Sequence, residues 1–127
     1  KRYMWFIIIS FSLSIIIFAL FPNGQDLRPV VFERQNLCTK LVQAIYSVDT
    51  NTNVLPSVHV IGSLAVVFAF FDSKALKCKL LRSLSVIIAL LICISTVFIK
   101  QHSVLDIIAG VIICIPVYLL VYRRKHN

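Results

Sequence analysis

Charged residues are scarce in this chain. Asp, Glu, Lys and Arg together make up 14% of its 127 residues, whereas 59% are hydrophobic. The mean hydropathy is +0.92, and the apolar share exceeds that of ordinary soluble domains. The composition therefore excludes a typical soluble domain and predicts a protein that lies in lipid.

Several common structural devices are absent as well. The four cysteines show no Cys-x-x-Cys spacing, so neither a disulfide framework nor a zinc knuckle is indicated. There is no solenoid repeat, low-complexity tract or long Gly/Ser linker, so one domain is expected over residues 1–127. The first apolar run has no small-residue cleavage site after it, which argues against a signal peptide. Because the chain opens with Lys1-Arg2, we expect a fragment.

Long apolar runs dominate what is present. Residues 3–21, 80–99 and 103–122 approach or reach the roughly 20 residues that a helix needs to cross about 30 Å of hydrocarbon. A fourth run, residues 57–72, is shorter and contains His59, so its length alone also allows a buried helix. We expect an all-α, multi-pass bundle of transmembrane helices.

The basic residues flank these runs. If all four runs cross the membrane, nine cations lie on one side, which the positive-inside rule assigns to the cytoplasm. Without the fourth span, the cluster from Lys74 to Arg82 and the basic tail would lie on the other side. The distribution predicts four spans and favours juxtamembrane cations over a nucleic-acid-binding patch. The nine are Lys1, Arg2, Lys74, Lys77, Lys79, Arg82, Arg123, Arg124 and Lys125.

One long polar segment, residues 22–56, then lies on the outer side. Within it Leu37, Leu41 and Ile45 recur at i, i+4 and i+8. This stripe predicts a short amphipathic helix that lies in the interface or caps the bundle. Arg28-Pro29 precedes it in chain expected to be extended. Functional residues are expected at this end of the protein.

Three polar residues, His59, His102 and Asp106, fall at the outer ends of spans, where lipid disfavours them. His102 and Asp106 are i and i+4 on a helix, so the carboxylate can accept the imidazole N–H and orient the ring. Such an imidazole is a nucleophile toward phosphorus, and His59 can protonate the leaving oxygen. Helix N-termini at Ser57 and Ser103 favour a bound anion. The pattern indicates phosphoryl transfer.

Each residue also has a plain structural interpretation. Residues 103–106 form a capping box, which accounts for Asp106 without catalysis. His59 can be a hydrogen-bonded interfacial histidine and Lys100 an interfacial anchor, and Arg28-Pro29 alone carries little information. The two histidine motifs together, on helix ends that charge counting places on one side, favour the functional interpretation.

These motifs resemble a known family. Pro56-Ser57-Val58-His59 and His102-Ser103-Val104-Leu105-Asp106 resemble the second and third signature motifs of the type 2 phosphatidic acid phosphatase superfamily, and Arg28-Pro29 resembles the end of the first. The resemblance covers nearly the whole chain in the right order. It implies a six-helix membrane enzyme of which two N-terminal spans are missing here.

The same resemblance implies roles for individual residues. His102 would be the nucleophile that forms a phosphohistidine, Asp106 its partner, and His59 the acid for the leaving group. Arg28 and Ser57 would hold the phosphoryl oxygens. No metal and no other cofactor would take part.

Two cations of the family pattern are missing. The first motif has a Lys seven residues before the Arg, where this chain has Phe21, and the third has an Arg six residues before the His, where it has Thr96. Lys100 is the expected substitute for one of these cations. Arg34 or Lys40 is the expected substitute for the other.

The reaction stays open among several classes. The preferred one is a metal-independent phosphatase for a lipid phosphate or pyrophosphate, in a plasma membrane with its site on the non-cytoplasmic side. Residues 99–102 also resemble a branch that includes inositol phosphorylceramide synthase-like enzymes, so a lipid phosphotransferase is the alternative. A catalytically inactive relative, or a membrane protein whose histidines bind zinc or haem, are the others. The expected partners are a lipid phosphate and the bilayer, with no nucleic acid.

Overall fold

The computed structural model describes residues 1–123 and places five α-helices in them. No β-strand occurs in this range, only an isolated bridge between Gly24 and Thr52. The expectation of an all-α chain is confirmed. The helices are α1 (Arg2–Leu20), α2 (Leu37–Val48), α3 (Val58–Asp72), α4 (Lys79–Phe98) and α5 (Val104–Tyr122).

Three of these helices, α1, α4 and α5, are long and apolar enough to cross a membrane. They contain 19, 20 and 19 residues. The α3 helix has 15 residues, which correspond to about 22 Å at 1.5 Å per residue and fall short of a full hydrocarbon core. A span at α3 stays a prediction from the charge pattern.

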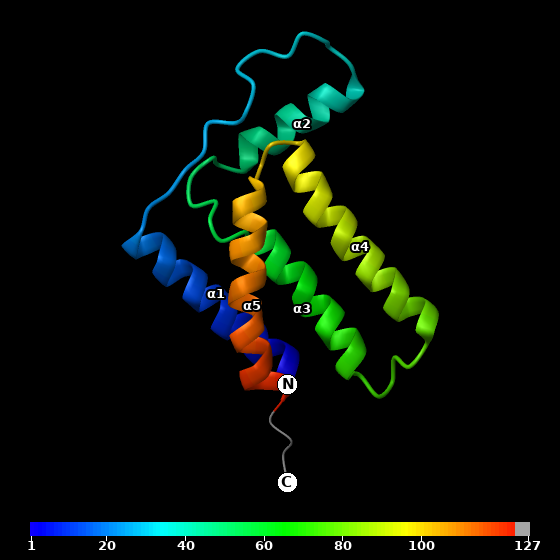
Figure 1. The fold of residues 1–127 in the computed structure, drawn as a ribbon. Coiled ribbons are helices and arrows are strands. Elements are labelled where there is room, and N and C mark those ends of the chain that lie inside the picture. The colour runs from blue at the N-terminus through cyan, green and yellow to red at the C-terminus, as the bar shows by residue number, and fades with distance from the viewer. Residues whose placement is uncertain (124–127) are drawn as a thin grey trace.

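The four longer helices run alternately in opposite directions (Figure 1). Helix α3 packs against α1, α4 and α5, and α1 also packs against α5. The start of α1, the α3–α4 turn and the end of α5 lie at one end, where Arg2 pairs with Asp72 at 2.6 Å. Helix α2 lies across the other end. The basic clusters described by the structure thus lie opposite α2, while Arg124 and Lys125 fall outside the described residues.

A small apolar core joins α1, α3 and α5. Its buried members are Phe6, Ile61, Ala65, Cys114 and Val117. Close contact between α3 and α5 depends on Gly110, since a Cβ there would lie 3.1 Å from the Ser57 carbonyl oxygen and 3.2 Å from the Val60 Cβ. Gly110 lies one turn below Asp106, so the outer ends of α3 and α5 are brought together at this point.

The polar segment 22–56 is held as a closed loop above the bundle. The Asn23 side chain accepts the N–H groups of Val54 and Leu55, each at 2.9 Å, so the two ends of the segment lie side by side. Within the segment, α2 begins at a capping box formed by Asn36 and Thr39. Its apolar stripe of Leu37, Leu41 and Ile45 is exposed, and contact of this stripe with a membrane interface stays a prediction.

Candidate active site

His59 and His102 meet at the outer end of the bundle, although 43 residues separate them in the sequence. His59 lies in the first turn of α3, and His102 lies in the turn between α4 and α5. The Nδ1 of His59 is 3.0 Å from the Nε2 of His102, and the rings meet edge to face with centroids 5.2 Å apart. His102 is buried, with 5% of its surface exposed.

The turn that carries His102 is shaped by Thr96 and Lys100. The Thr96 carbonyl accepts two N–H groups, from Gln101 at 2.9 Å and from His102 at 3.1 Å. Lys100 has a φ of 54°, a left-handed conformation that reverses the chain after α4. Thr96 therefore stands in place of a family arginine with its side chain buried and its carbonyl oxygen fixing the backbone of the candidate nucleophile.

Asp106 faces His102 and also caps α5. Its Oδ2 lies 3.5 Å from the His102 Nδ1 and accepts the Ser103 N–H at 2.7 Å. The Ser103 hydroxyl accepts the Asp106 N–H in return, which completes the capping box. Within residues 1–123 the His102 Nδ1 has no hydrogen-bond partner. The expected hydrogen bond between His102 and Asp106 is thus not formed at this distance of 3.5 Å, and one carboxylate oxygen faces both His102 and the Ser103 N–H.

The surroundings of His102 favour the neutral imidazole. Burial lowers its pKa, and the charge of His59 lowers it further, while Asp106 opposes part of this shift. In the tautomer that carries its proton on Nδ1, facing Asp106, the His102 Nε2 has the lone pair and can accept from the His59 Nδ1–H. This tautomer leaves the Nε2, the atom expected to act as nucleophile, unprotonated.

Ser57 ties α3 to the first turn of α5. The residue is fully buried and is the N-cap of α3, where its hydroxyl accepts the Val60 N–H at 3.5 Å. Its backbone N–H donates to the Asp106 carbonyl at 3.1 Å. Ser57 accordingly places the N-terminus of α3 beside Asp106.

Arg28 reaches the histidines only through other residues. Its guanidinium donates to the Asp49 carboxylate at 3.0 Å and to the Thr50 carbonyl at 3.1 Å, and lies 4.6 Å from the centroid of the Tyr46 ring. The Arg28 Nε is buried without a partner in residues 1–123. Asp49 in turn accepts a hydrogen bond from Gln101 at 2.8 Å. Arg28 is thus linked to the residue before His102, and not to either imidazole directly.

The sequence reasoning missed Tyr46, Asp49 and Gln101. The Tyr46 hydroxyl donates to the Ile99 carbonyl, and burial raises the Tyr46 pKa, which keeps the phenol protonated, although Arg28 opposes part of the shift. Gln25 also donates to the Gln101 carbonyl. These contacts fasten the outer segment to the His102 turn. Asp49 could have been singled out because acidic residues are scarce in this chain, which has only 5 of them.

The expected substitute cations lie at the surface. Lys100 is exposed on the His102 turn, and Arg34 and Lys40 are exposed on the outer segment. Phe21, where the family has a lysine, is 71% exposed. The structure therefore brings His59, His102, Asp106 and Ser57 together, whereas the side chain of Lys100 is exposed. Among residues 1–123, no group of three or more His, Cys, Asp or Glu side chains is arranged to hold a metal ion.

Comparison with known proteins gives one match. The family model described as the PAP2 superfamily matches residues 3–127, which is almost the whole chain. No curated protein and no solved structure matches it.

Proposed function

Because the chain belongs to the PAP2 superfamily, which includes phosphatases and related phosphotransferases, we propose that it is a membrane phosphatase acting on a lipid phosphate or pyrophosphate. The observation that carries this proposal is the contact between two imidazoles, His59 half-buried and His102 buried, with the His59 Nδ1 at 3.0 Å from the His102 Nε2 and a carboxylate behind His102. His102 is then the nucleophile, and His59 lies directly beside it as the group that transfers protons in covalent phosphoryl transfer.

In the first step the His102 Nε2 attacks phosphorus. An N–P bond forms, the P–O bond to the lipid breaks, and His59, in its imidazolium form, donates a proton to the departing oxygen and becomes neutral. A positioned acid of this kind contributes about 10²- to 10⁴-fold in rate. Asp106, whose oxygen lies 3.5 Å from the His102 Nδ1, stabilises the positive charge that develops on the ring.

In the second step the phosphohistidine is hydrolysed. His59 takes a proton from water, the water oxygen attacks phosphorus, and the N–P bond breaks to release phosphate and restore His102. A phosphorus atom must approach the Nε2 to about 3–3.5 Å, so it cannot fit between nitrogens that are 3.0 Å apart. Substrate binding therefore has to separate the two rings.

The phosphoryl oxygens need positive partners, and three sources lie at this end. The first turn of α3, capped at Ser57, presents N–H groups and the positive end of the helix dipole. Lys100 extends from the His102 turn. Arg28 becomes available if a phosphate competes with the Asp49 carboxylate for its guanidinium.

A lipid phosphotransferase is the second candidate. The same phosphohistidine would form, and a lipid alcohol would replace water as the acceptor. Its supporting observation is the burial of His102, which leaves 5% of the residue exposed and limits the access of bulk water to the intermediate. In both cases we place the site at the non-cytoplasmic face of a plasma membrane, because the basic ends of the described helices lie opposite it.

Phosphate release from a panel of lipid phosphates, measured with EDTA present, tests the proposal. We expect release by the unchanged protein and at least about 10³-fold less by His102→Ala, since the nucleophile is removed. Gln43→Ala, on the exposed side of α2, is the control and should retain the rate. A phosphate adduct on His102, found by mass spectrometry after alkaline quenching, identifies the intermediate. Equal release by His102→Ala and the unchanged protein would contradict the mechanism.

The transferase is tested in the same assay. Adding a lipid alcohol should generate a new phospholipid in place of free phosphate if a transferase is present. Hydrolysis alone, at the same rate with and without the alcohol, would remove the alternative.

A further inference from the structure

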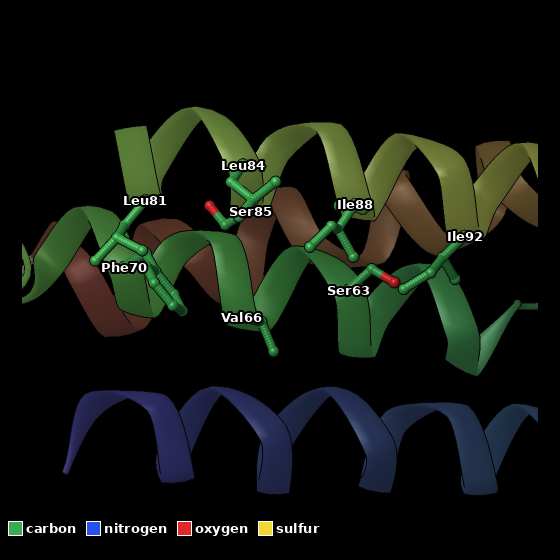
Figure 2. A pocket seen from close by; sticks show the side chains of 9 residues that line it. Ser63, Val66, Phe70, Leu81, Leu84, Ser85, Ile88 and Ile92 are labelled. Carbon is green, nitrogen blue, oxygen red and sulfur yellow. The ribbon is translucent and has the colours of Figure 1, made fainter. Parts of the chain in front are cut away.

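An apolar groove lies between α3 and α4 (Figure 2). Its volume is about 250 Å³. Ser63 and Ile92 lie at one end of the groove, and Phe70 and Leu81 lie at the other. The walls include Ser63, Val66 and Phe70 of α3 and Ser85, Ile88 and Ile92 of α4.

The α3 wall is the inward continuation of the helix face that carries His59. Ser63, Val66 and Phe70 follow His59 at i+4, i+7 and i+11, which places all four positions on one face of the helix. The Ser63 hydroxyl donates to the His59 carbonyl at 2.7 Å. The groove therefore begins about one helical turn after His59, or roughly 6 Å farther along the axis of α3.

The α4 wall leads to the other histidine. Ile88 and Ile92 are followed on the same face by Thr96, at spacings of four residues. Thr96 is the residue whose carbonyl accepts the His102 N–H at 3.1 Å. Both walls thus end at the candidate active site, one at His59 and the other at the turn of His102.

The groove has the surface chemistry of a hydrocarbon site. Its only two polar lining side chains are serines, and both hydroxyls are satisfied by their own helix: Ser63 donates to His59, and Ser85 donates to the Arg82 carbonyl at 2.7 Å. No lining residue is charged. Val66 and Ile88 remain 42% and 47% exposed, so the groove is open to an occupant along its side. From Leu81 to Ile92 it extends about 16 Å.

We propose that this groove binds the hydrocarbon chain of the substrate, with the phosphate at His59 and His102 and the chain directed toward Phe70 and Leu81. This inference rests on the function proposed above and narrows it. The substrate class is a phosphate or pyrophosphate at the end of a long alkyl or prenyl chain, because one strip between two helices accommodates one chain. Burial of that chain contributes favourable binding free energy, which holds the phosphate end at the histidines.

Activity on hexadecyl phosphate and on butyl phosphate tests the proposal. Ile88→Trp fills the groove, and Leu90→Trp, on the same helix with a 57% exposed side chain that does not line it, is the matched control. We expect Ile88→Trp to lower the ratio of kcat/KM for the long to the short substrate by about tenfold or more, since loss of two buried methylene groups already has that effect. Leu90→Trp should leave the ratio unchanged. An equal ratio in all three proteins would overturn the proposal.

Photolabelling tests the groove without requiring turnover. A hexadecyl phosphate with a diazirine in its chain is bound to the His102→Ala protein, illuminated and mapped by mass spectrometry. We expect labels on groove residues such as Val66 and Ile92, and competition by excess hexadecyl phosphate but not by phosphatidylcholine. Labels spread over α1 and α5, or labels that phosphatidylcholine displaces equally, would identify general lipid contact and overturn the proposal. Specific labelling of the His102→Ala protein, together with no phosphate release by the unchanged protein, would instead refute the phosphatase function and retain the groove as a binding site.

Discussion

Asp49 and Gln101 are joined by a hydrogen bond of 2.8 Å across 52 residues of sequence. The same Asp49 oxygen accepts from Arg28 at 3.0 Å, so one carboxylate connects the outer segment, the guanidinium and the His102 turn. Gln101 lies immediately before His102 and is itself buried. The position of the candidate nucleophile consequently depends on a residue that belongs to neither histidine motif.

Replacing Asp49 should therefore loosen the His102 turn. Asp49→Ala removes the oxygen that accepts both hydrogen bonds, and we expect it to lower the free energy of unfolding by about 1–2 kcal/mol, a value reduced by the 38% exposure of this side chain. Asp49→Asn keeps a carbonyl for Gln101 and should lose less. Thermal unfolding in detergent measures both variants. Stability of Asp49→Ala equal to that of the unchanged protein would show that the bridge does not hold the turn.

Asp106 variants separate helix capping from catalysis. Asp106→Asn retains an oxygen that can accept the Ser103 N–H, so stability should change little, but it removes the charge beside His102, and kcat should fall by about 10²- to 10⁴-fold. Asp106→Ala removes both, with an added loss of about 1 kcal/mol of stability. Phosphate release and thermal unfolding are measured on both. A fully active Asp106→Asn protein would leave capping as the only role.

The lowered pKa of His102 gives a pH dependence of defined sign. The pKa of His102 in the folded chain lies below its unfolded value of about 6.5. As the pH falls from 6.5 toward the folded-state pKa, the unfolded chain binds a proton that the folded chain does not bind, so the contribution of His102 to stability is lost. The neutral nucleophile in turn persists below pH 6.5. Titration of the His102 Cε1–H by NMR, assigned by comparison with His102→Ala, should show a midpoint below 6.5. A midpoint at or above 6.5 is incompatible with the buried geometry.

Gly110 tests how close α3 and α5 must be. Gly110→Ala places a Cβ 3.1 Å from the Ser57 carbonyl and 3.2 Å from the Val60 Cβ, which we expect to destabilise the protein by about 1–3 kcal/mol and to reduce phosphate release by displacing Asp106 and His59. Gly62→Ala is the control, since its Cβ would meet no atom within 4 Å and the gain in helix propensity is favourable. If both variants behave alike in activity and unfolding, the close approach is not required.

The helices were predictable from the sequence because their signal is local. Apolar runs of the length of a bilayer form α1, α4 and α5, and the Pro56-Ser57 and Ser103 start signals lie where α3 and α5 begin. The meeting of His59 and His102 followed from motifs placed at the same end of the bundle. These inferences needed only spacing, polarity and the direction of each helix.

The environment of Arg28 was not predictable in the same way. Its pairing with Asp49 and its position over Tyr46 depend on how the outer segment folds back, which no local pattern specifies. Thr96 is similar, because its contribution is made by a backbone carbonyl and not by its side chain. A motif comparison at this position shows that the cation of the family pattern is absent, but it cannot show the role of the Thr96 carbonyl.

The contact between the two imidazoles masks the nucleophile at rest. The His102 Nε2 lies 3.0 Å from the His59 Nδ1, so a ligand gains access only if its own binding compensates for a hydrogen bond that is typically worth about 0.5–1.5 kcal/mol. Free phosphate can offset this cost only through the contacts of the phosphate group itself. A ligand with a hydrocarbon tail also gains free energy from burial of that tail. We therefore expect the contact between His59 and His102 to discriminate against small soluble phosphates.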